Sequence, residues 1–255
     1  MARMNDAPSV AFFGSTGGCV LACLALALKN GCTSCALVRD PAKLQGLLRE
    51  RGVLESQIDS HLTIVKGNST DLEAVRRTLA PNGEPVDLVI SGVGGKLLMG
   101  NPLKPVLNNP TICADTVRTV IEASGELERK PTLVVISATG MKNKHDLPLA
   151  MQPLYWWLLK CPLADKTIME KTILEEMKKP EDRRAIRDYS IVRPSFFTDG
   201  EGEGLAKIRD GREDRPAVGY TITRNDVGLW LFENFVRRPL HQENRFLGQA
   251  VTITF

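Results

Sequence analysis

A glycine-rich segment near the start of the chain carries residue types that bind phosphate. It consists of Gly14, Ser15, Thr16, Gly17, Gly18 and Cys19. The apolar run 10–13 before it predicts a buried strand, and the Ala- and Leu-rich run 21–28 after it predicts a buried helix. Glycines let backbone N–H groups approach a diphosphate, and a helix N-terminus favours negative charge. The segment therefore predicts the phosphate-binding turn of a nucleotide-binding fold.

Alternating strand-like and helix-like segments follow this turn. Strands are predicted at residues 33–38, 62–65, 86–90, 132–136 and 189–192, and helices at 41–51, from 71 onward, at 111–124 and at 164–179. The strands are continuously apolar and helices follow them, which is typical of a parallel sheet covered on both faces. The sequence therefore predicts an α/β fold with a doubly wound, Rossmann-type parallel sheet.

Small or polar residues lie where several predicted strands end. They are Gly14 after the first strand, Asn68 and Ser69 after the third, Gly92, Val93 and Gly94 after the fourth, and Ser137 after the fifth. Ligands of doubly wound sheets bind at the carboxyl ends of the strands. We therefore expect these residues to surround one binding site, with all but Ser137 contacting the cofactor.

Arg39 follows the second predicted strand, where an NAD enzyme usually places an acidic residue on the ribose 2′-hydroxyl. An arginine at this point suits the 2′-phosphate of NADP. The neighbouring Asp40 leaves an alternative open, since it can cap the next helix or contact a ribose. The sequence favours NADP(H) over NAD, and a nucleotide-type fold without a cofactor stays an alternative.

Composition and charge narrow the classes of partner. The chain of 255 residues suits one large α/β domain or two small ones, and its net charge of +3 mixes both signs without a basic block for nucleic acid. The cysteines are interpreted as reduced thiols, although Cys32 and Cys35 have redox-type spacing. The polar N-terminus predicts no signal peptide, the run 19–28 is too short to span a bilayer, and the histidines have no metal-ligand spacing. We expect a cytoplasmic monomer or homodimer that binds a small-molecule substrate.

Six motifs occur in the order that one protein family shows. They are Gly-Ser-Thr-Gly at 14–17, Leu-Val-Arg-Asp-Pro-Ala-Lys-Leu at 37–44, Gly-Asn-Ser-Thr-Asp at 67–71, Ser-Ala-Thr-Gly at 137–140, Ile-Val-Arg-Pro at 191–194 and Ile-Thr-Arg-Asn-Asp-Val at 222–227. Together they resemble the atypical short-chain dehydrogenases/reductases, in particular the NmrA-like and biliverdin-reductase-B-like branch. The resemblance implies one NADP(H)-binding Rossmann domain over 1–255, with a small substrate lobe that includes segments 140–162 and 195–220.

One position departs from the family pattern. The third glycine of the family's Gly-x-x-Gly-x-x-Gly pattern is Val20 here. That glycine ordinarily permits close packing of the helix on the strand. We expect Gly18 and Ala22 to relieve the crowding that a valine brings.

Typical members of the family use a Tyr and a Lys four residues apart on one helix, where the Lys lowers the pKa of the Tyr. Tyr155 and Lys160 are five apart, which leaves them about 140° apart around a helix axis. Pro162 is expected to break that helix just after Lys160. The usual pair is therefore predicted to be absent. Tyr155 stays a catalytic candidate, with an aromatic lid or core formed with Trp156 and Trp157 as the alternative.

Lys166 is the second catalytic candidate. A 100° step per residue places Met169, Ile173 and Met177 within about 60° of it, so it lies on an apolar helix face. A lysine there is unexpected unless it reaches a cleft or snorkels to solvent. In isoflavone-reductase-like relatives a catalytic lysine occupies a similar place, ahead of a helical acidic residue such as Glu170 here.

Ser137 is the third catalytic candidate. It matches the family's site serine, and the resemblance implies that it hydrogen-bonds a substrate carbonyl, unless it caps local backbone. His145 is an acid–base residue by type, but it lies in a charged loop where solvent exposure is expected.

These expectations combine into an NADPH-dependent reductase. The nicotinamide is expected near residues 93–94 and Ser137, with a conjugated carbonyl or quinone-type compound as hydride acceptor and Lys166 or solvent as proton donor. The aromatic segments 155–157 and 196–197 are expected to form an apolar lid and wall. The resemblance also admits a cofactor-sensing regulator without turnover, or an isomerase, cyclase or epimerase of natural-product pathways. Fold alone does not choose between them.

Overall fold

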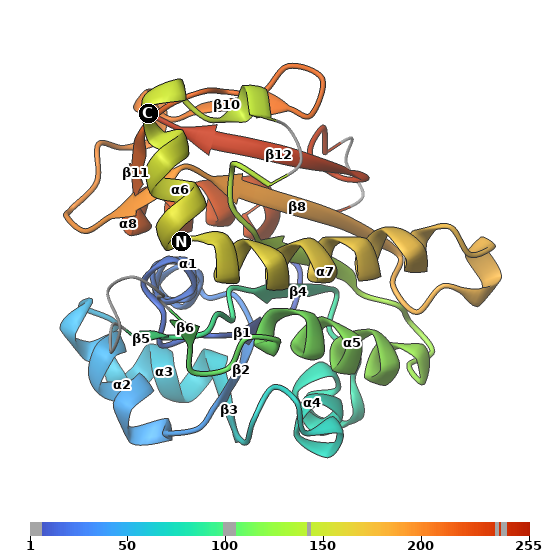
Figure 1. Ribbon diagram of the computed structural model, residues 1–255. Helices are drawn as coiled ribbons and strands as arrows, with labels where there is room; N and C mark the ends of the chain where they lie inside the picture. Colours follow the sequence, from blue (N-terminus) through green and yellow to red (C-terminus); the bar gives the residue numbers. More distant parts are fainter. Residues whose placement is uncertain (1–6, 99–105, 142–143, 238–239, 241–243) are drawn as a thin grey trace.

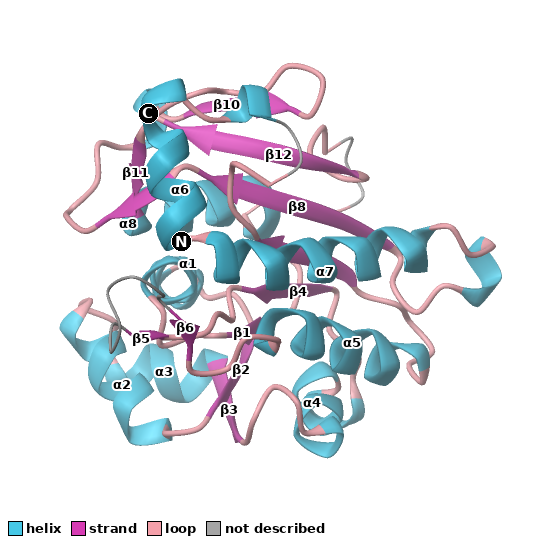
Figure 2. Ribbon diagram, in the orientation of Figure 1, coloured by secondary structure: helices cyan, strands magenta, loops and turns pink. Residues whose placement is uncertain are grey.

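A computed structural model describes residues 7–98, 106–141, 144–237, 240 and 244–255. Its centre is an eight-stranded sheet (Figures 1 and 2). In spatial order the strands are β10 (Arg209–Arg212), β12 (Gln249–Thr254), β8 (Asp188–Pro194), β7 (Thr132–Ile136), β4 (Leu88–Ser91), β1 (Val10–Phe13), β2 (Ser34–Val38) and β3 (Leu62–Lys66). All neighbouring strands run parallel except the edge strand β10, which is antiparallel to β12. The predicted doubly wound α/β fold is confirmed.

Helices cover both faces of the sheet. One face carries α1 (Gly18–Lys29), α2 (Pro41–Glu50), α3 (Glu55–His61) and α8 (Arg224–Leu231), and the other carries α4 (Leu72–Leu79), α5 (Ile112–Gly125) and α7 (Lys160–Met177). Alternate residues of β1 divide between the two cores. Phe12 packs into the core beneath α1 and α8, and Phe13 into the core beneath α4 and α5. Burial on both sides explains why the inner strands β1, β2, β4 and β7 are continuously apolar.

Shorter elements flank the carboxyl ends of the strands. Strands β9 (Phe196–Thr198) and β11 (Thr221–Thr223) form a small parallel sheet, and β5 (Leu97–Leu98) pairs with β6 (Val106–Leu107). Helix α6 (Gln152–Leu158) precedes α7. Short 3-10 turns lie at Pro81–Gly83, Lys144–Asp146, Leu149–Met151, Glu181–Arg183 and Leu205–Lys207, with a π-helical turn at Phe232–Val236. Within the described ranges, no helix has both the length and the apolar character to cross a bilayer.

Side-chain caps fix the starts of two helices after strands. The Asp40 carboxylate accepts from the backbone N of Lys43 at 3.1 Å, so the capping alternative for this residue is confirmed. The Asp71 carboxylate accepts from the backbone N of Glu73 and of Ala74, which confirms the predicted cap of α4. Both caps place the preceding turn at the carboxyl edge of the sheet.

The expected position of the helix break is wrong. The chain between Tyr155 and Lys160 does not form one helix, because α6 ends at Leu158 and α7 begins at Lys160. Pro162 lies inside the first turn of α7, where its missing N–H costs no intrahelical hydrogen bond. Tyr155 and Lys160 therefore belong to two different helices, whose axes differ in direction (Figure 1).

Candidate active site

A cavity of about 510 Å³ opens at the carboxyl ends of β1, β4, β7 and β8. One wall is backbone: Gly17 and Gly18 at the start of α1, and residues 92–95 after β4. The rest of the lining is mainly apolar and includes Tyr155, Leu158, Leu163, Phe196 and Phe197. Both predicted lobe segments therefore contribute to this cavity, and the predicted aromatic wall is confirmed at Tyr155, Phe196 and Phe197. The side chain of Trp156 lies outside the described residues.

The glycine turn leaves the N-terminus of α1 open to a ligand. Gly14 has a φ of +80°, and a Cβ on it would lie 2.9 Å from the carbonyl carbon of Gly92. The Gly17 amide donates to the Gly14 carbonyl at 2.8 Å and closes the turn. Helix α1 has no side-chain cap, and its first turn contains no acidic residue. Amide groups at such an end attract an anion, so these residues fit the diphosphate of a dinucleotide.

Gly92 accommodates the valine that departs from the family pattern. A Cβ on Gly92 would lie 2.5 Å from Cγ2 of Val20 and 3.0 Å from Cδ1 of Ile136. The expectation that Gly18 and Ala22 relieve this crowding is wrong, because the space lies on the strand side of the contact. Gly18 instead lies beneath the side chain of Arg224, and Ala22 packs against Gly228.

The predicted cofactor residues divide into two groups by position. Six of them line the cavity: Gly17, Gly18, Cys19, Gly92, Val93 and Gly94. The others, Gly14, Ser15, Thr16, Arg39, Asn68 and Ser69, follow β1, β2 and β3 along the same edge of the sheet. Their contacts with a cofactor stay predictions.

Two predicted hydroxyl groups are occupied within the protein. Ser15 is fully buried and donates to the carbonyl of Phe12 at 3.2 Å. The hydroxyls of Ser69 and Thr116 share a hydrogen bond at 2.7 Å. Arg39, in contrast, is exposed directly after β2, where its guanidinium is accessible to a ligand.

Lys166 reaches the cavity from α7. Its Nζ donates to the carbonyl oxygens of Ile136 at 3.0 Å and of Ser137 at 2.8 Å, at the end of β7. Burial lowers the pKa of the Lys166 amine from its ordinary value. An ammonium has three N–H donors, so two anchor the group and one is left for a ligand. Of the two alternatives left open for Lys166, reaching a cleft or snorkelling to solvent, the structure shows the cleft, and the catalytic role of the lysine stays a prediction.

Ser137 lies beneath the cavity floor. It is fully buried, and its hydroxyl donates to Oε1 of Glu170 at 2.7 Å. Glu170 is also fully buried and accepts two hydrogen bonds from the guanidinium of Arg193, at 3.0 and 2.7 Å. Ser137 thus completes a buried ion pair, and its neighbours Ile136 and Ala138 line the cavity in its place.

Tyr155 faces the cavity without an activating cation in its hydrogen bond. Its hydroxyl shares a hydrogen bond with Oγ1 of Thr139 at 3.2 Å, and burial raises the pKa of the phenol. A phenol with a raised pKa holds its proton more firmly than the lysine-activated phenol of typical family members. Tyr155 thus lines the cavity without the lysine partner of typical family members, and its catalytic role stays a prediction. Trp157 and His145 are both exposed, as expected for the histidine.

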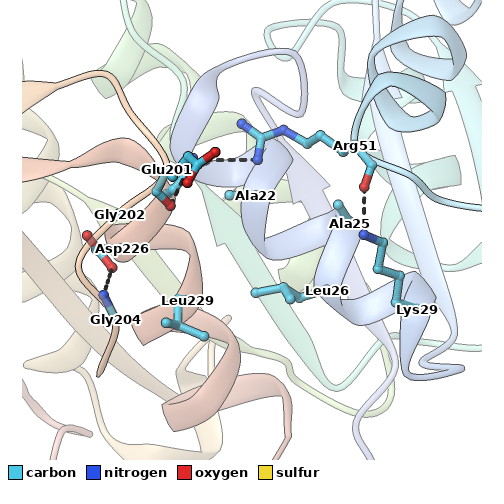
Figure 3. Close-up of a pocket in the computed structure, with 11 residues that line it drawn as sticks. Ala22, Ala25, Leu26, Lys29, Arg51, Glu201, Gly202, Gly204, Asp226 and Leu229 are labelled. Carbon is cyan, nitrogen blue, oxygen red and sulfur yellow. Dashed lines mark hydrogen bonds between the residues drawn. The ribbon is translucent and has the colours of Figure 1, made fainter. Parts of the chain in front are cut away.

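A second cavity, of about 660 Å³, lies further along α1, between α1 and α8 (Figure 3). Three of its charged side chains, Lys29, Arg51 and Asp226, are held by protein partners. Lys29 donates to the carbonyl of Arg51 at 2.6 Å, the Arg51 guanidinium to Asn225 at 2.8 Å, and the Gly204 amide to the Asp226 carboxylate at 2.9 Å. This cavity lies beside the helices and away from the strand ends, so we assign the ligand site to the first cavity.

Comparison with known sequences identifies the family of the chain. The family model described as NAD(P)H-binding matches residues 14–236. The chain is 49% identical over 263 residues to Reductase pytE of Aspergillus terreus, covering 98% of this chain and 99% of the relative. It is 34% identical over 286 residues to Oxidase pynE of Aspergillus niger, covering 97% and 98% of the two chains.

A solved structure extends the likeness to the fold. The chain matches a short-chain dehydrogenase/reductase from Veillonella parvula in complex with NADP, with a TM-score of 0.68 at 11% identity, covering 98% of this chain and 95% of that chain. The likeness to this solved structure shows a shared fold. The NAD(P)H-binding family model and the relative named reductase bear out the resemblance seen in the motifs. The chain belongs to the NAD(P)H-binding family, and it is an oxidoreductase.

Proposed function

We propose that this protein is an NADP(H)-dependent oxidoreductase acting on a small, largely apolar substrate with a conjugated carbonyl or quinone group. The observation that carries the proposal is Lys166, an anchored cation with a lowered pKa that lines an apolar cavity beside the glycine turn. A proton donor and a cofactor turn at the same cavity are what carbonyl reduction requires.

The residues that would hold the cofactor follow the edge of the sheet. The turn Gly14–Gly18 and the amides of α1 would bind the diphosphate, and residues 92–94 would pass beside the nicotinamide ribose. Arg39 would pair with the 2′-phosphate, which is the basis for proposing NADP(H) rather than NAD. When bound, the dihydronicotinamide supplies a hydride.

Lys166 would stabilise the oxygen that gains charge and would deliver its proton. Its two hydrogen bonds to backbone carbonyls hold Nζ in place, so little reorganisation is needed at the moment of reaction. The lowered pKa makes the ammonium a better acid near neutral pH than an exposed lysine. In the oxidative direction the same amine would accept the proton.

The cavity walls support the substrate class. Among the described residues that line the cavity, the charged side chains are Lys166 and Arg224, and the other side chains are mainly aliphatic and aromatic. Such a wall favours a flat, apolar body with one polar group directed at Lys166. One relative is named a reductase and the other an oxidase, so turnover is assayed in both directions.

The proposal is tested by cofactor consumption. The purified protein is mixed with NADPH or NADH and a panel of quinones and enones, and the loss of absorbance of the reduced cofactor is followed. We expect turnover with NADPH and at least one apolar acceptor. If NADPH binds tightly but no acceptor consumes it, and NADP⁺ is not consumed with any corresponding alcohol either, a cofactor-sensing regulator is favoured instead.

A further inference from the structure

Arg224 lies directly over the start of α1. It is the first residue of α8, and Thr223 before it caps that helix. A Cβ on Gly18 would lie 2.6 Å from Cδ and 3.1 Å from Cβ of Arg224. A side chain at position 18 would therefore have to displace the arginine stem that crosses it. The contact brings a cation to the end of α1 that has no side-chain cap.

The guanidinium of Arg224 is held at the rim of the cavity. It lies 5.3 Å from the ring centroid of Phe197, and its Nη1 donates to Oδ1 of Asp199 at 2.7 Å. The Asp199 side chain is 90% exposed and that of Arg224 is 36% exposed. Both Arg224 and Phe197 line the same cavity as Gly17 and Gly18. The aromatic ring fixes the plane of the guanidinium. At one edge of the guanidinium, the Asp199 carboxylate can be exchanged for another hydrogen-bond acceptor.

The pair with Asp199 is not needed to hold the loop that contains it. The loop after β9 is already fastened to α8 by Asp226, whose buried carboxylate accepts from the amides of Glu203 at 2.8 Å and Gly204 at 2.9 Å. Asn225 adds a hydrogen bond to the carbonyl of Gly200. An exposed pair of this kind contributes little to folding stability, so a doubly charged competitor can displace the carboxylate.

We propose that Arg224 is a diphosphate-binding residue, and that Asp199 occupies its guanidinium until the cofactor replaces it. The inference rests on the proposed binding of a dinucleotide at the glycine turn and adds a side-chain contact to the backbone amides of α1. The diphosphate would then be bound between the α1 N-terminus and a guanidinium that Phe197 orients. Because NADPH and NADH share the diphosphate, Arg224 contributes to the affinity for both without choosing between them.

Binding titrations on two substitutions test this role. Arg224→Met keeps an apolar stem over Gly18 but removes the charge, and Asp199→Asn keeps the shape of the competitor but weakens it. Dissociation constants for NADPH, NADH and ADP-ribose are measured by calorimetry at two salt concentrations. We expect R224M to weaken all three by about 10- to 100-fold, with the NADPH to NADH ratio unchanged and a smaller salt dependence. We expect D199N to tighten all three by about 2- to 5-fold.

A matched control comes from elsewhere on the surface. Arg245 likewise lies over an aromatic ring, Phe246 at 4.6 Å, and pairs with an acidic residue, Asp210 at 3.0 Å. Arg245→Met should leave all three dissociation constants unchanged. Thermal melts verify that each variant is folded. Because D199N changes only an exposed side chain, it still tests the inference if R224M fails to fold.

The outcomes separate this inference from the proposed function. If the unmodified protein binds NADPH but R224M changes its affinity by less than twofold, or D199N weakens it, then Arg224 is a structural residue and the inference is wrong. If R224M alters NADPH but leaves NADH unchanged, Arg224 recognises the 2′-phosphate and the inference is equally wrong. If the unmodified protein binds neither dinucleotide at millimolar concentration, the proposed function itself fails.

Discussion

Lys166 donates from Nζ to the carbonyl oxygen of Ser137 at 2.8 Å, while the hydroxyl of Ser137 donates away from the cavity to Glu170 at 2.7 Å. One residue thus contributes its backbone to the site and its side chain to the core. The relationship fixes the lysine relative to the end of β7 and engages the serine hydroxyl with the buried Glu170. Substitutions at the two positions are therefore expected to differ in their effect on turnover, with a large loss at Lys166 and little change at Ser137.

The first prediction concerns the two residues of this pair. Lys166→Met removes the proton donor, and we expect it to lower turnover by about 100-fold or more with the affinity for NADPH little changed. It also leaves two backbone carbonyls without the Lys166 donor, so the free energy of unfolding should fall by about 1–3 kcal/mol. Steady-state kinetics and denaturant titration measure both effects.

Lys171→Met, an exposed position on the same helix, is the control and should change neither quantity. Ser137→Ala should reduce stability, because Glu170 loses a donor, but should leave turnover within about threefold. A loss of turnover in S137A as large as that in K166M would restore the serine to the chemistry. Full turnover in K166M would remove the lysine from it.

The second prediction concerns the pH dependence of reduction. Burial holds the pKa of Lys166 below its ordinary value of 10.5, so the ammonium that donates the proton is lost as pH rises through that lowered pKa. We expect the rate of reduction to fall along a single titration curve centred below pH 10.5. The thiols of Cys19 and Cys113 face this amine, but burial raises the pKa of each to about 12, so neither contributes to the curve.

A substitution identifies the group that titrates. Lys166→Arg keeps the charge and stays protonated throughout, so the curve should disappear while some activity remains. The carboxylates beside the lysine, Asp165 and Glu170, are not substituted in this variant, so it alters only the group at position 166. If the same curve persists in K166R, another group controls the rate.

The third prediction concerns cofactor preference. Arg39 is exposed after β2, and a pairing with the 2′-phosphate should make the affinity for NADPH at least about tenfold higher than that for NADH. Arg39→Ala should remove most of that difference and leave the affinity for NADH nearly unchanged. Lys43→Ala, four residues further along, is the control, because only its backbone takes part in the cap of α2. Equal affinities in the unmodified protein would show that the assignment is wrong.

Strands with continuous apolar character were predictable, and contacts between distant segments were not. The run that forms β7 has the predicted bounds, 132–136, because its residues are buried on both faces. The strand β12 was not predicted: threonines interrupt its apolar pattern, and it joins the sheet beside β8 only through tertiary pairing. Helix α8 was missed for a related reason, since its short apolar face becomes evident only where it packs on α1.

The candidate site shows the same division. Lys166 could be identified as a candidate site residue from the sequence, because a charge on an apolar helix face needs an explanation. The orientation of the Ser137 hydroxyl was not, since it depends on the fully buried Glu170 and its partner Arg193. Arg224 lay within a quoted motif, but only the fold shows that its stem crosses Gly18.

The last prediction concerns the contact that replaces the missing family glycine. Val20 and Gly92 are complementary, since a Cβ on Gly92 would lie 2.5 Å from Cγ2 of Val20. Gly92→Ala should therefore destabilise the protein by about 1–3 kcal/mol through overpacking, and Val20→Ala by a similar amount through the loss of buried methyl groups.

In the double variant the methyl group added at position 92 fills space that the valine side chain vacates. We expect the cost of G92A to be smaller by at least about 1 kcal/mol in the V20A background than in the unmodified protein, measured by urea denaturation of all four proteins. Additive effects would mean that Ile136, the other neighbour at 3.0 Å, limits the space instead, and that Val20 is tolerated at this turn for some other reason.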